Sequence, residues 1–412
     1  MDKISIKSEV AKLKKVIVHQ PGQEIEFMTP DSAQHLLYDD ILDMPTAIQE
    51  HIEFTDILRL HAEVLEVNDL IEDLLNNDKC RCDLLTELID QQKAEVHFLD
   101  RLMPLESKEL ANKLICGVKE TENTLTEYLS DLHYALSPLP NFLYTRDTAV
   151  VINNSILPVS MSNSVRTPEA TIMRHILKNM NRFDSEGLYF ESPLEIKQHS
   201  TFEGGDILVI REDILAIGIS ERTSTHAIDQ LIDVLKKKGQ IKHIFAVQLH
   251  KQRALIHLDM AFTMIDENFA CIYEPAIYGD LHFGTFHMDI SETKNKVSQV
   301  PNILKGLQKI GMDIEPIICG GRERIYQDRE QWMCGANYFT LAPGKITGYG
   351  RSIRTYEQID RIAKMPRIEA DDVLLGKVDL NDYSRYAIAF RGSELCRGGG
   401  GARCMTLPIE RL

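Results

Sequence analysis

A cysteine close to the C-terminus follows an unusual stretch of backbone. Cys404 follows four consecutive glycines, with two residues between, in RGGGGARCM, residues 397–405. Glycine lets a backbone approach a flat substrate closely and frees a neighbouring side chain to project into a cleft. The run fits neither the P-loop nor the dinucleotide fingerprint, because their other residues and their strand–helix context are missing. Most cysteines are buried hydrophobic residues, so Cys404 is a candidate nucleophile only if partners come from elsewhere in the chain.

Carboxylates and one histidine lie at or near the starts of apolar segments. In a strand over LIHLDMAF, His257 and Asp259 would share one face, and burying them is costly unless both have partners. Glu203 and Asp206 flank two glycines before the strand of TFEGGDILVI. The stretch PNFLYTRDTAVVI places Asn141, Tyr144, Arg146 and Asp147 directly before another strand.

Several carboxylates around one cysteine suit a cationic substrate. A guanidinium is planar and offers five N–H donors, so two or three carboxylates can hold its central carbon in front of a thiolate. Attack on that carbon gives a covalent intermediate, and a histidine can protonate the leaving ammonia and then activate water. The residues therefore predict a hydrolase that acts on a guanidinium group.

A repeated structural unit is expected to position these residues. Strand–turn–strand patterns occur over residues 149–160, 206–220, 262–273 and 338–350, and a helix and a further strand usually follow. Similar units arranged around an axis would form a propeller-like α/β body with a shared central site. The alternative is an ordinary mixed α/β domain whose hairpins resemble each other by chance.

The N-terminal part divides into two regions. Residues 14–22, 46–61 and 63–67 are expected to form a strand, a helix and a strand, whereas residues 71–137 favour helices alone. One of these helices, over 124–136, would begin with a capping box formed by Thr124 and Glu127. We therefore expect a catalytic α/β domain over 1–70 and 138–412, with a helical insertion over 71–137.

Six motifs resemble those of the arginine deiminases, in order along nearly the whole chain. They are PNxxYTRDT, FxEGGD, IGISERT, IHLD, REQWMCGAN and SELCRGGGGARCMTLPI. The resemblance implies the pentein fold, a five-bladed α/β propeller, with an inserted helical domain. It also implies hydrolysis of L-arginine to L-citrulline and ammonia through an amidino intermediate on cysteine, without a metal or a cofactor.

The resemblance also implies a role for each matched residue. Cys404 would be the nucleophile and His257 the acid and base, while Asp147 and Asp259 would grip the guanidinium and Glu203 would orient it and help proton transfer. The residues matched to substrate binding are Asn141, Arg166 and Arg222 at the α-carboxylate, Tyr144 over the alkyl chain, and Asp206 behind the site.

Three positions depart from the family pattern. Gly399 replaces an arginine of a mobile loop, Cys334 an aspartate, and Ser352 an asparagine. Without that arginine, we expect the loop to be more mobile and to bind arginine less tightly, unless Arg397 or Arg403 fills the same space.

Composition and charge narrow the class of protein. The 412 residues carry a formal net charge of -16, which argues against nucleic acid or an anionic membrane as partner. No run of about 18 apolar residues could span a bilayer, and the eight cysteines fit free thiols better than a disulfide framework. We expect a cytoplasmic enzyme that forms a homo-oligomer.

Other functions remain open at this stage. A related hydrolase could act on a modified or decarboxylated arginine, although Arg166 and Arg222 favour a free α-carboxylate. A binuclear-metal ureohydrolase would need D-x-H-x-D and S-x-D-x-D patterns, which the chain lacks. A degenerate deiminase with a binding role is the non-enzymatic alternative.

Overall fold

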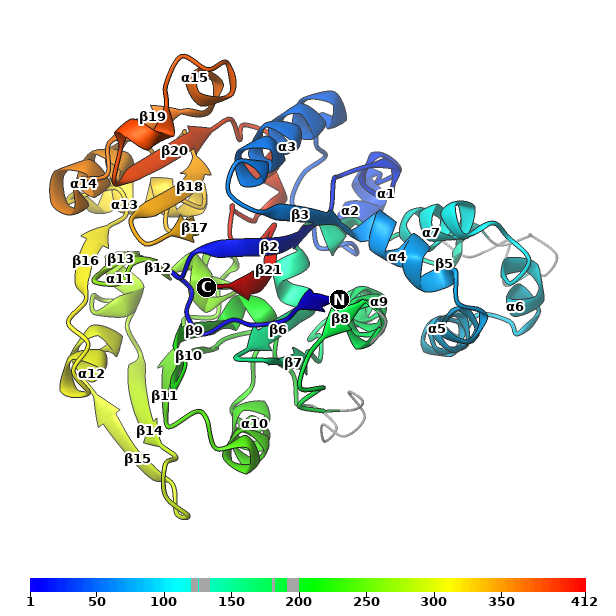
Figure 1. Ribbon diagram of the computed structural model, residues 1–412, viewed down its shortest axis with the longest axis horizontal. Coiled ribbons are helices and arrows are strands. Elements are labelled where there is room, and N and C mark those ends of the chain that lie inside the picture. The colour runs from blue at the N-terminus through cyan, green and yellow to red at the C-terminus, as the bar shows by residue number, and fades with distance from the viewer. Residues whose placement is uncertain (120–124, 126–133, 180–181, 191–199) are drawn as a thin grey trace.

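The chain forms a mixed α/β structure in a computed structural model (Figure 1). The structure describes residues 1–119, 125, 134–179, 182–190 and 200–412. The sheets lie around the middle of the molecule, and helices lie outside them (Figure 1). No helix in the described ranges combines the length and the apolar character that crossing a membrane requires.

The first unit joins the two ends of the chain. Strand β2 (Leu13–Val18) pairs in parallel with β3 (Glu63–Glu66), and α3 (Met44–Arg59) connects them. The C-terminal strand β21 (Leu407–Arg411) pairs antiparallel with the other edge of β2. The segment that contains Cys404 is therefore fixed to the N-terminal part of the protein.

Four further units begin with the predicted hairpins, which the structure confirms. Each hairpin is antiparallel, and in three of them a later strand adds in parallel. The hairpins are β6–β7 (Ala149–Ile152, Ser155–Pro158), β9–β10 (Ile207–Arg211, Ile214–Ile219), β12–β13 (Phe262–Asp266, Phe269–Ile272) and β17–β18 (Phe339–Ala342, Lys345–Tyr349). The parallel additions are β11 (His243–Gln248), β16 (Glu315–Ile318) and β20 (Tyr386–Phe390).

Helices and edge strands complete these units. The main outer helices are α9 (Thr167–Lys178), α10 (Thr225–Lys238), α12 (Ile303–Lys309) and α14 (Ile353–Ala363). The sheets are extended by β14 (Gly284–Asp289) and β15 (Lys296–Val300) beside β11, and by β19 (Arg367–Glu369) beside β20, while β1 (Asp2–Lys3) pairs with β8 (Phe183–Asp184). The other α-helices outside residues 71–137 in the described ranges are α1 (Gln23–Glu26), α2 (Pro30–Ala33), α11 (Glu274–Ile277), α13 (Arg324–Trp332) and α15 (Ala370–Leu374), besides α3.

The region expected to be a helical insertion projects to one side (Figure 1). It contains α4 (Val67–Leu75), α5 (Asp78–Gln91), α6 (His97–Leu102) and α7 (Ser107–Cys116). The prediction of a helix over 124–136 is wrong at its C-terminal end, because β5 (Tyr134–Leu136) is a strand that pairs with β4 (Val118–Lys119). The capping-box residues Thr124 and Glu127 lie outside the described residues.

The hydrophobic core crosses the boundary between the two expected domains. Leu74, Leu88 and Leu114 of the helical region belong to the same buried cluster as Val150 of β6 and Ile172 of α9. Burial of these apolar side chains fixes the helical region against the unit that carries Asp147. The division into two domains stays a prediction, as do the cytoplasmic location and the homo-oligomer.

Candidate active site

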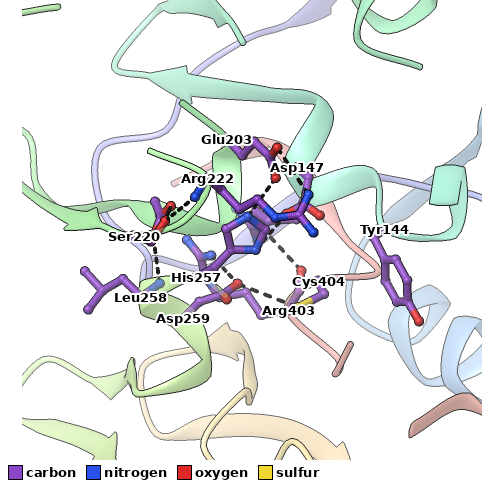
Figure 2. A network of polar contacts seen from close by, with 12 residues as sticks. Tyr144, Asp147, Glu203, Ser220, Arg222, His257, Leu258, Asp259, Arg403 and Cys404 are labelled. Atoms are coloured by element: carbon purple, nitrogen blue, oxygen red, sulfur yellow. Dashed lines mark hydrogen bonds and ion pairs between the residues drawn. The ribbon is translucent and has the colours of Figure 1, made fainter. Parts of the chain in front are cut away.

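The predicted catalytic residues meet at the places where the chain enters strands. They come from the segments that precede β6 (Asp147), β9 (Glu203), β12 (His257 and Asp259) and β21 (Cys404). All are buried, and their side chains lie around one centre (Figure 2). Strands that start near the middle of the molecule thus bring residues from distant parts of the chain together.

The prediction that His257 and Asp259 lie in a strand is wrong. His257 is extended, but Leu258–Met260 form a single 3-10 turn, and β12 begins only at Phe262. The turn sends the two side chains to different partners. His257 contacts Glu203 and Asp259 contacts Arg403.

His257 is held between two carboxylates. Its Nε2 lies 2.9 Å from Glu203 Oε2, and its Nδ1 lies 3.6 Å from Asp147 Oδ1. Burial alone would lower the pKa of His257, but Asp147 and the hydrogen bond to Glu203 raise this pKa to about 9. Burial alone would raise the pKa of Glu203, but His257 and the nearby arginines lower it to about 2. The pair is therefore an imidazolium and a carboxylate at neutral pH.

The two glycines of EGGD make room for this contact. A Cβ on Gly205 would lie 2.5 Å from His257 Nδ1, and a Cβ on Gly204 would lie 2.0 Å from the carbonyl oxygen of Arg146. Both distances are shorter than non-bonded atoms tolerate. The motif therefore packs the Glu203 turn directly against the histidine and the segment that carries Asp147.

Cys404 lies beside Asp259 in a polar cluster. Its Sγ is 3.8 Å from Asp259 Oδ2, and the same oxygen accepts a hydrogen bond from Arg403 Nη1 at 2.8 Å. The side chain of Asn337 joins the two segments, because its Oδ1 accepts from the amides of Arg403 and Cys404 and its Nδ2 donates to the carbonyl of Asp259. Asn337 ends the REQWMCGAN motif, yet nothing in the sequence pattern alone assigns it a role.

Asp206 supports the histidine turn from behind. Its carboxylate accepts hydrogen bonds from Ser220 Oγ at 2.6 Å and from the amide of Leu258 at 2.8 Å. Burial raises the pKa of Asp206 to about 6. Since its partners belong to the protein, Asp206 fixes the position of His257 rather than facing the centre of the site.

Two of the residues predicted to bind the α-carboxylate have partners within the protein. Arg166 donates to Asp147 Oδ2 at 2.6 Å, to Glu169 Oε2 at 2.9 Å and to the carbonyl of Asn141 at 3.1 Å. The side-chain amide of Asn141 donates to the carbonyl of Leu36 at 2.7 Å. These contacts tie Arg166 and Asn141 to the walls of the site.

Arg222, in contrast, keeps a donor available. Its Nη1 is 3.6 Å from Glu203 Oε1 and has no hydrogen-bond acceptor among the described residues. The side chain is buried next to Glu203, at the edge of the site (Figure 2). A buried arginine donor that makes an ion pair but no hydrogen bond can still donate to a substrate carboxylate.

Tyr144 accounts for the glycine run before Cys404. A Cβ on Gly398 would lie 2.3 Å from Tyr144 Oη, and a Cβ on Gly400 would lie 2.4 Å from Tyr144 Cε1. Only a backbone without side chains can pack this closely on the ring. The glycines therefore let the loop cover Tyr144, which lies beside Cys404 in Figure 2.

The three charged groups nearest the centre also offer ligand atoms for a metal. Suitable atoms of Asp147, Glu203 and His257 all lie within 4.8 Å of one another. In the structure these atoms belong to ion pairs with each other and with Arg166 and Arg222. A metal would have to displace the proton of His257 and compete with both arginines.

Comparison with known proteins decides the family. The sequence profile of arginine deiminase matches residues 34–411. The arginine deiminases of Streptococcus pneumoniae strains CGSP14 and Hungary19A-6 are each 32% identical to the chain over 428 aligned residues, which cover 99% of this chain and 98% of each relative. The chain belongs to the arginine deiminase family.

Solved structures show the same fold at low sequence identity. A cysteine-to-serine mutant of dimethylarginine dimethylaminohydrolase from Pseudomonas aeruginosa, complexed with citrulline, has a TM-score of 0.52 at 15% identity over 96% of this chain and 99% of its own. SxtG, an amidinotransferase from Microseira wollei, has a TM-score of 0.55 at 12% identity over 99% and 97%. These likenesses show that the chain shares the mixed α/β fold of these two enzymes.

One departure from the arginine deiminase pattern is explained by its surroundings. Gly399 has a φ of +91°, and a Cβ there would lie 3.1 Å from the guanidinium of Arg253. Arg253 also donates to Asp39 at 2.7 Å and to the carbonyl of Leu37 at 3.1 Å. An arginine at position 399 would be strained by the positive φ and would require the Arg253 guanidinium to shift.

Neither Arg397 nor Arg403 fills the space beside Gly399. Arg397 points outward, where it pairs with Asp40 and, at 2.8 Å, with Glu394. Arg403 points inward to Asp259. The residue that sequence reasoning missed here is Arg253, which lies only four positions before His257.

The other two departures are both buried, and Cys334 lies against the same loop. Cys334 is buried, and a Cβ on Gly401 would lie 2.9 Å from the Cβ of Cys334. Ser352 is also buried, and a Cβ on Gly335 would lie 2.7 Å from its Oγ. Both positions are crowded by neighbouring backbone, so small side chains fit there.

The thiol of Cys404 is expected to be protonated in the resting enzyme. Burial, followed by the charges of Asp259 and Asp147, raises the pKa of Cys404 well above the usual value. Alkylation by a neutral reagent such as iodoacetamide should therefore be slow at neutral pH and should accelerate as the pH rises into the alkaline range. A bound, non-reactive guanidinium that leaves the thiol accessible should lower this pKa and speed the reaction at neutral pH.

The rate of Cys404 modification, followed by peptide mass spectrometry across a pH series, measures this effect. The other buried cysteines serve as internal controls, because a guanidinium in the site should not change their rates. A Cys404 rate that is already maximal below neutral pH in the free enzyme would contradict the expectation.

Proposed function

We propose that this member of the arginine deiminase family hydrolyses L-arginine to L-citrulline and ammonia. One observation carries the proposal. The Cys404 thiol lies beside Asp259, whose Oδ1 accepts no hydrogen bond from the described residues, and the same is true of the buried Oδ1 of Asp147, which lies 3.6 Å from His257 Nδ1. Two such oxygens are the acceptors that a guanidinium needs.

In the first step the thiolate of Cys404 attacks the guanidinium carbon. The thiol proton leaves to solvent as the cation binds, because the positive charge offsets the carboxylates that oppose thiolate formation. A C–S bond forms, the His257 imidazolium donates its proton to one terminal nitrogen, and ammonia leaves as the C–N bond breaks. The pKa of His257, about 9, keeps the proton available at neutral pH.

The second step releases citrulline. The neutral His257 takes a proton from a water molecule, and the resulting hydroxide adds to the carbon. The C–S bond then breaks, the thiolate leaves, and the carbonyl oxygen gives its remaining proton to that thiolate, which restores the resting thiol. Glu203 holds the imidazole through Nε2 in both steps and balances its charge when it is protonated.

Arg222 is the residue best placed to bind the substrate's α-carboxylate. Its Nη1 is free of hydrogen bonds to the described residues, whereas Arg166 already contacts two carboxylates. Arg166 and Asn141 would add to carboxylate recognition only if substrate binding rearranged their present contacts. Tyr144 would pack along the alkyl chain.

The arrangement of the sheets supports a five-bladed propeller. Five units each place a turn that enters a strand near the centre, and these turns carry Asp147, Glu203, His257, Asn337 and Cys404. We infer that the five units are the blades, and that the helices of residues 71–137 form a separate insertion.

A side-by-side citrulline assay tests the function. We expect citrulline from L-arginine and far less product from agmatine, which lacks the α-carboxylate, or from methylated arginines, which carry fewer N–H donors. Activity should persist in a chelator. Preference for agmatine would instead favour a hydrolase of decarboxylated arginine, and no turnover with tight arginine binding would favour a binding protein.

A further inference from the structure

Asp147 and Asp259 each have one carboxylate oxygen that is hydrogen-bonded to a buried arginine. The Oδ2 of Asp147 accepts from Arg166 at 2.6 Å, and the Oδ2 of Asp259 accepts from Arg403 at 2.8 Å. The Oδ1 of each is buried without a hydrogen bond to any described residue. Each arginine thus occupies one oxygen and leaves the other available to the substrate, and at Asp147 this second oxygen also lies 3.6 Å from His257 Nδ1.

Each of these arginines is in turn held by a buried glutamate. Glu169 Oε2 accepts from Arg166 Nε at 2.9 Å. Glu9 binds Arg403 through both oxygens, with Nε to Oε2 and Nη2 to Oε1 each at 3.0 Å. The two chains of contacts, Glu169–Arg166–Asp147 and Glu9–Arg403–Asp259, are called here the Glu169 arm and the Glu9 arm.

The glutamates limit what each arginine can do. A guanidinium that is free to rotate would bind an aspartate through two parallel hydrogen bonds and occupy both oxygens. With Nε and Nη2 of Arg403 committed to Glu9, and Nη2 also donating to the carbonyl of Ile207 at 3.1 Å, only Nη1 remains for Asp259. The arm therefore prevents the protein's own cation from blocking the substrate's place.

The Glu9 arm is itself fixed to the sheet. The amide of Glu9 donates to the carbonyl of Val209 in β9 at 2.8 Å, and the amide of Val209 donates to Glu9 Oε1 at 3.3 Å. Arg403 directly precedes Cys404 in the chain. The same arm therefore fixes both the carboxylate that grips the substrate and the residue next to the nucleophile.

We infer that Glu9 and Glu169 are positioning residues, each of which holds an arginine so that one oxygen of Asp259 or Asp147 stays free for the substrate guanidinium. The inference rests on the proposed function, because it assigns the free oxygens to arginine. It adds two residues, one from the N-terminal segment, that do not touch the substrate.

Arginine binding to a Cys404→Ala background tests the Glu9 arm, because the substrate then stays intact. Isothermal titration calorimetry should show that Glu9→Gln weakens arginine binding about ten-fold or more, as expected when a charge-assisted contact is lost. Asp259→Asn should weaken binding too. Adding Glu9→Gln to Asp259→Asn should cost little further, because the glutamate acts through that aspartate.

A matched control separates positioning from the loss of any buried glutamate. Glu330 is buried and accepts hydrogen bonds from the Thr355 amide and hydroxyl, outside the site. Glu330→Gln should leave arginine binding unchanged. In the active enzyme, Glu9→Gln should raise KM more than it lowers kcat, whereas a general loss of structure would reduce the active fraction without that pattern.

Specific outcomes would overturn the inference. Unchanged binding in Glu9→Gln, or an equal loss in the presence and absence of Asp259→Asn, would contradict the role of the arm. If Glu9→Gln does not fold, the same cycle with Glu169→Gln and Asp147→Asn tests the other arm. No arginine binding in Cys404→Ala, combined with no citrulline from the unmodified enzyme, would instead contradict the proposed function.

Discussion

Replacing Cys404 by alanine is expected to abolish citrulline formation while the protein stays folded. The methyl group removes the atom that forms the covalent bond, and no other described cysteine has a contact with Asp259 Oδ2. We expect kcat to fall by a factor of at least about 10⁴, because the carboxylates bind the guanidinium but cannot replace a nucleophile. Citrulline measured over hours at high enzyme concentration gives the residual rate.

Intact-protein mass spectrometry after an acid quench tests the covalent step directly. The unmodified enzyme should carry the mass of the amidino adduct during turnover, and Cys404→Ala should carry none. Cys271 is a matched control, since it is buried and free but contacts the carbonyl of Gly335 away from the catalytic residues. Cys271→Ala should therefore retain both the adduct and the activity, and appreciable turnover by Cys404→Ala would contradict the mechanism.

Local sequence patterns are sufficient to predict the hairpins and the strand entries that carry Asp147 and Glu203, but not the turn that carries His257 and Asp259. Residues 149–160 and 206–220 alternate short apolar runs with polar turn residues, and the structure forms the expected antiparallel pairs there. Glu203 and Asp147 were placed just before strands, and they are found there. These features depend on neighbours in sequence, which is why a single sequence shows them.

Contacts between distant segments could not be predicted. Glu9 and Arg403 are 394 positions apart, and neither residue alone indicates that they bind each other. The pairing of Tyr134–Leu136 with Val118–Lys119 likewise overrides the helical pattern of that segment. The role of Arg253 beside Gly399 also depends on a loop that only the folded chain brings near.

The geometry around the glycine run changes what its sequence implied. A loop without side chains suggested extra mobility, but Gly398 and Gly400 pack against Tyr144, and Gly399 packs against Arg253. Glu50 also accepts hydrogen bonds from the amides of residues 393–395 at the start of this loop. The glycines therefore allow close packing. The absence of an arginine at position 399 does not by itself make the loop mobile.

A glycine at position 257 is expected to separate the two chemical steps. His257→Gly removes the group that protonates ammonia and later activates water, so turnover of arginine should fall by about 10² to 10⁴. The terminal nitrogen must be protonated before it can leave as ammonia, whereas a sulfur substituent can leave as a thiolate without being protonated. An S-alkylthiocitrulline should therefore still react with Cys404 in this variant, expelling the thiol and leaving the same amidino group on the sulfur.

The adduct should then persist, because the water that hydrolyses it has lost its base. Mass spectrometry should show a stable adduct in His257→Gly with the S-alkylthiocitrulline and little adduct with arginine, while the unmodified enzyme turns over both. His282→Gly is a control, since this half-buried histidine contacts Thr285 rather than a residue of the site, and it should turn over both compounds. Rapid hydrolysis of the adduct in His257→Gly would assign water activation to another residue, with Glu203 the nearest candidate because it contacts the imidazole at 2.9 Å.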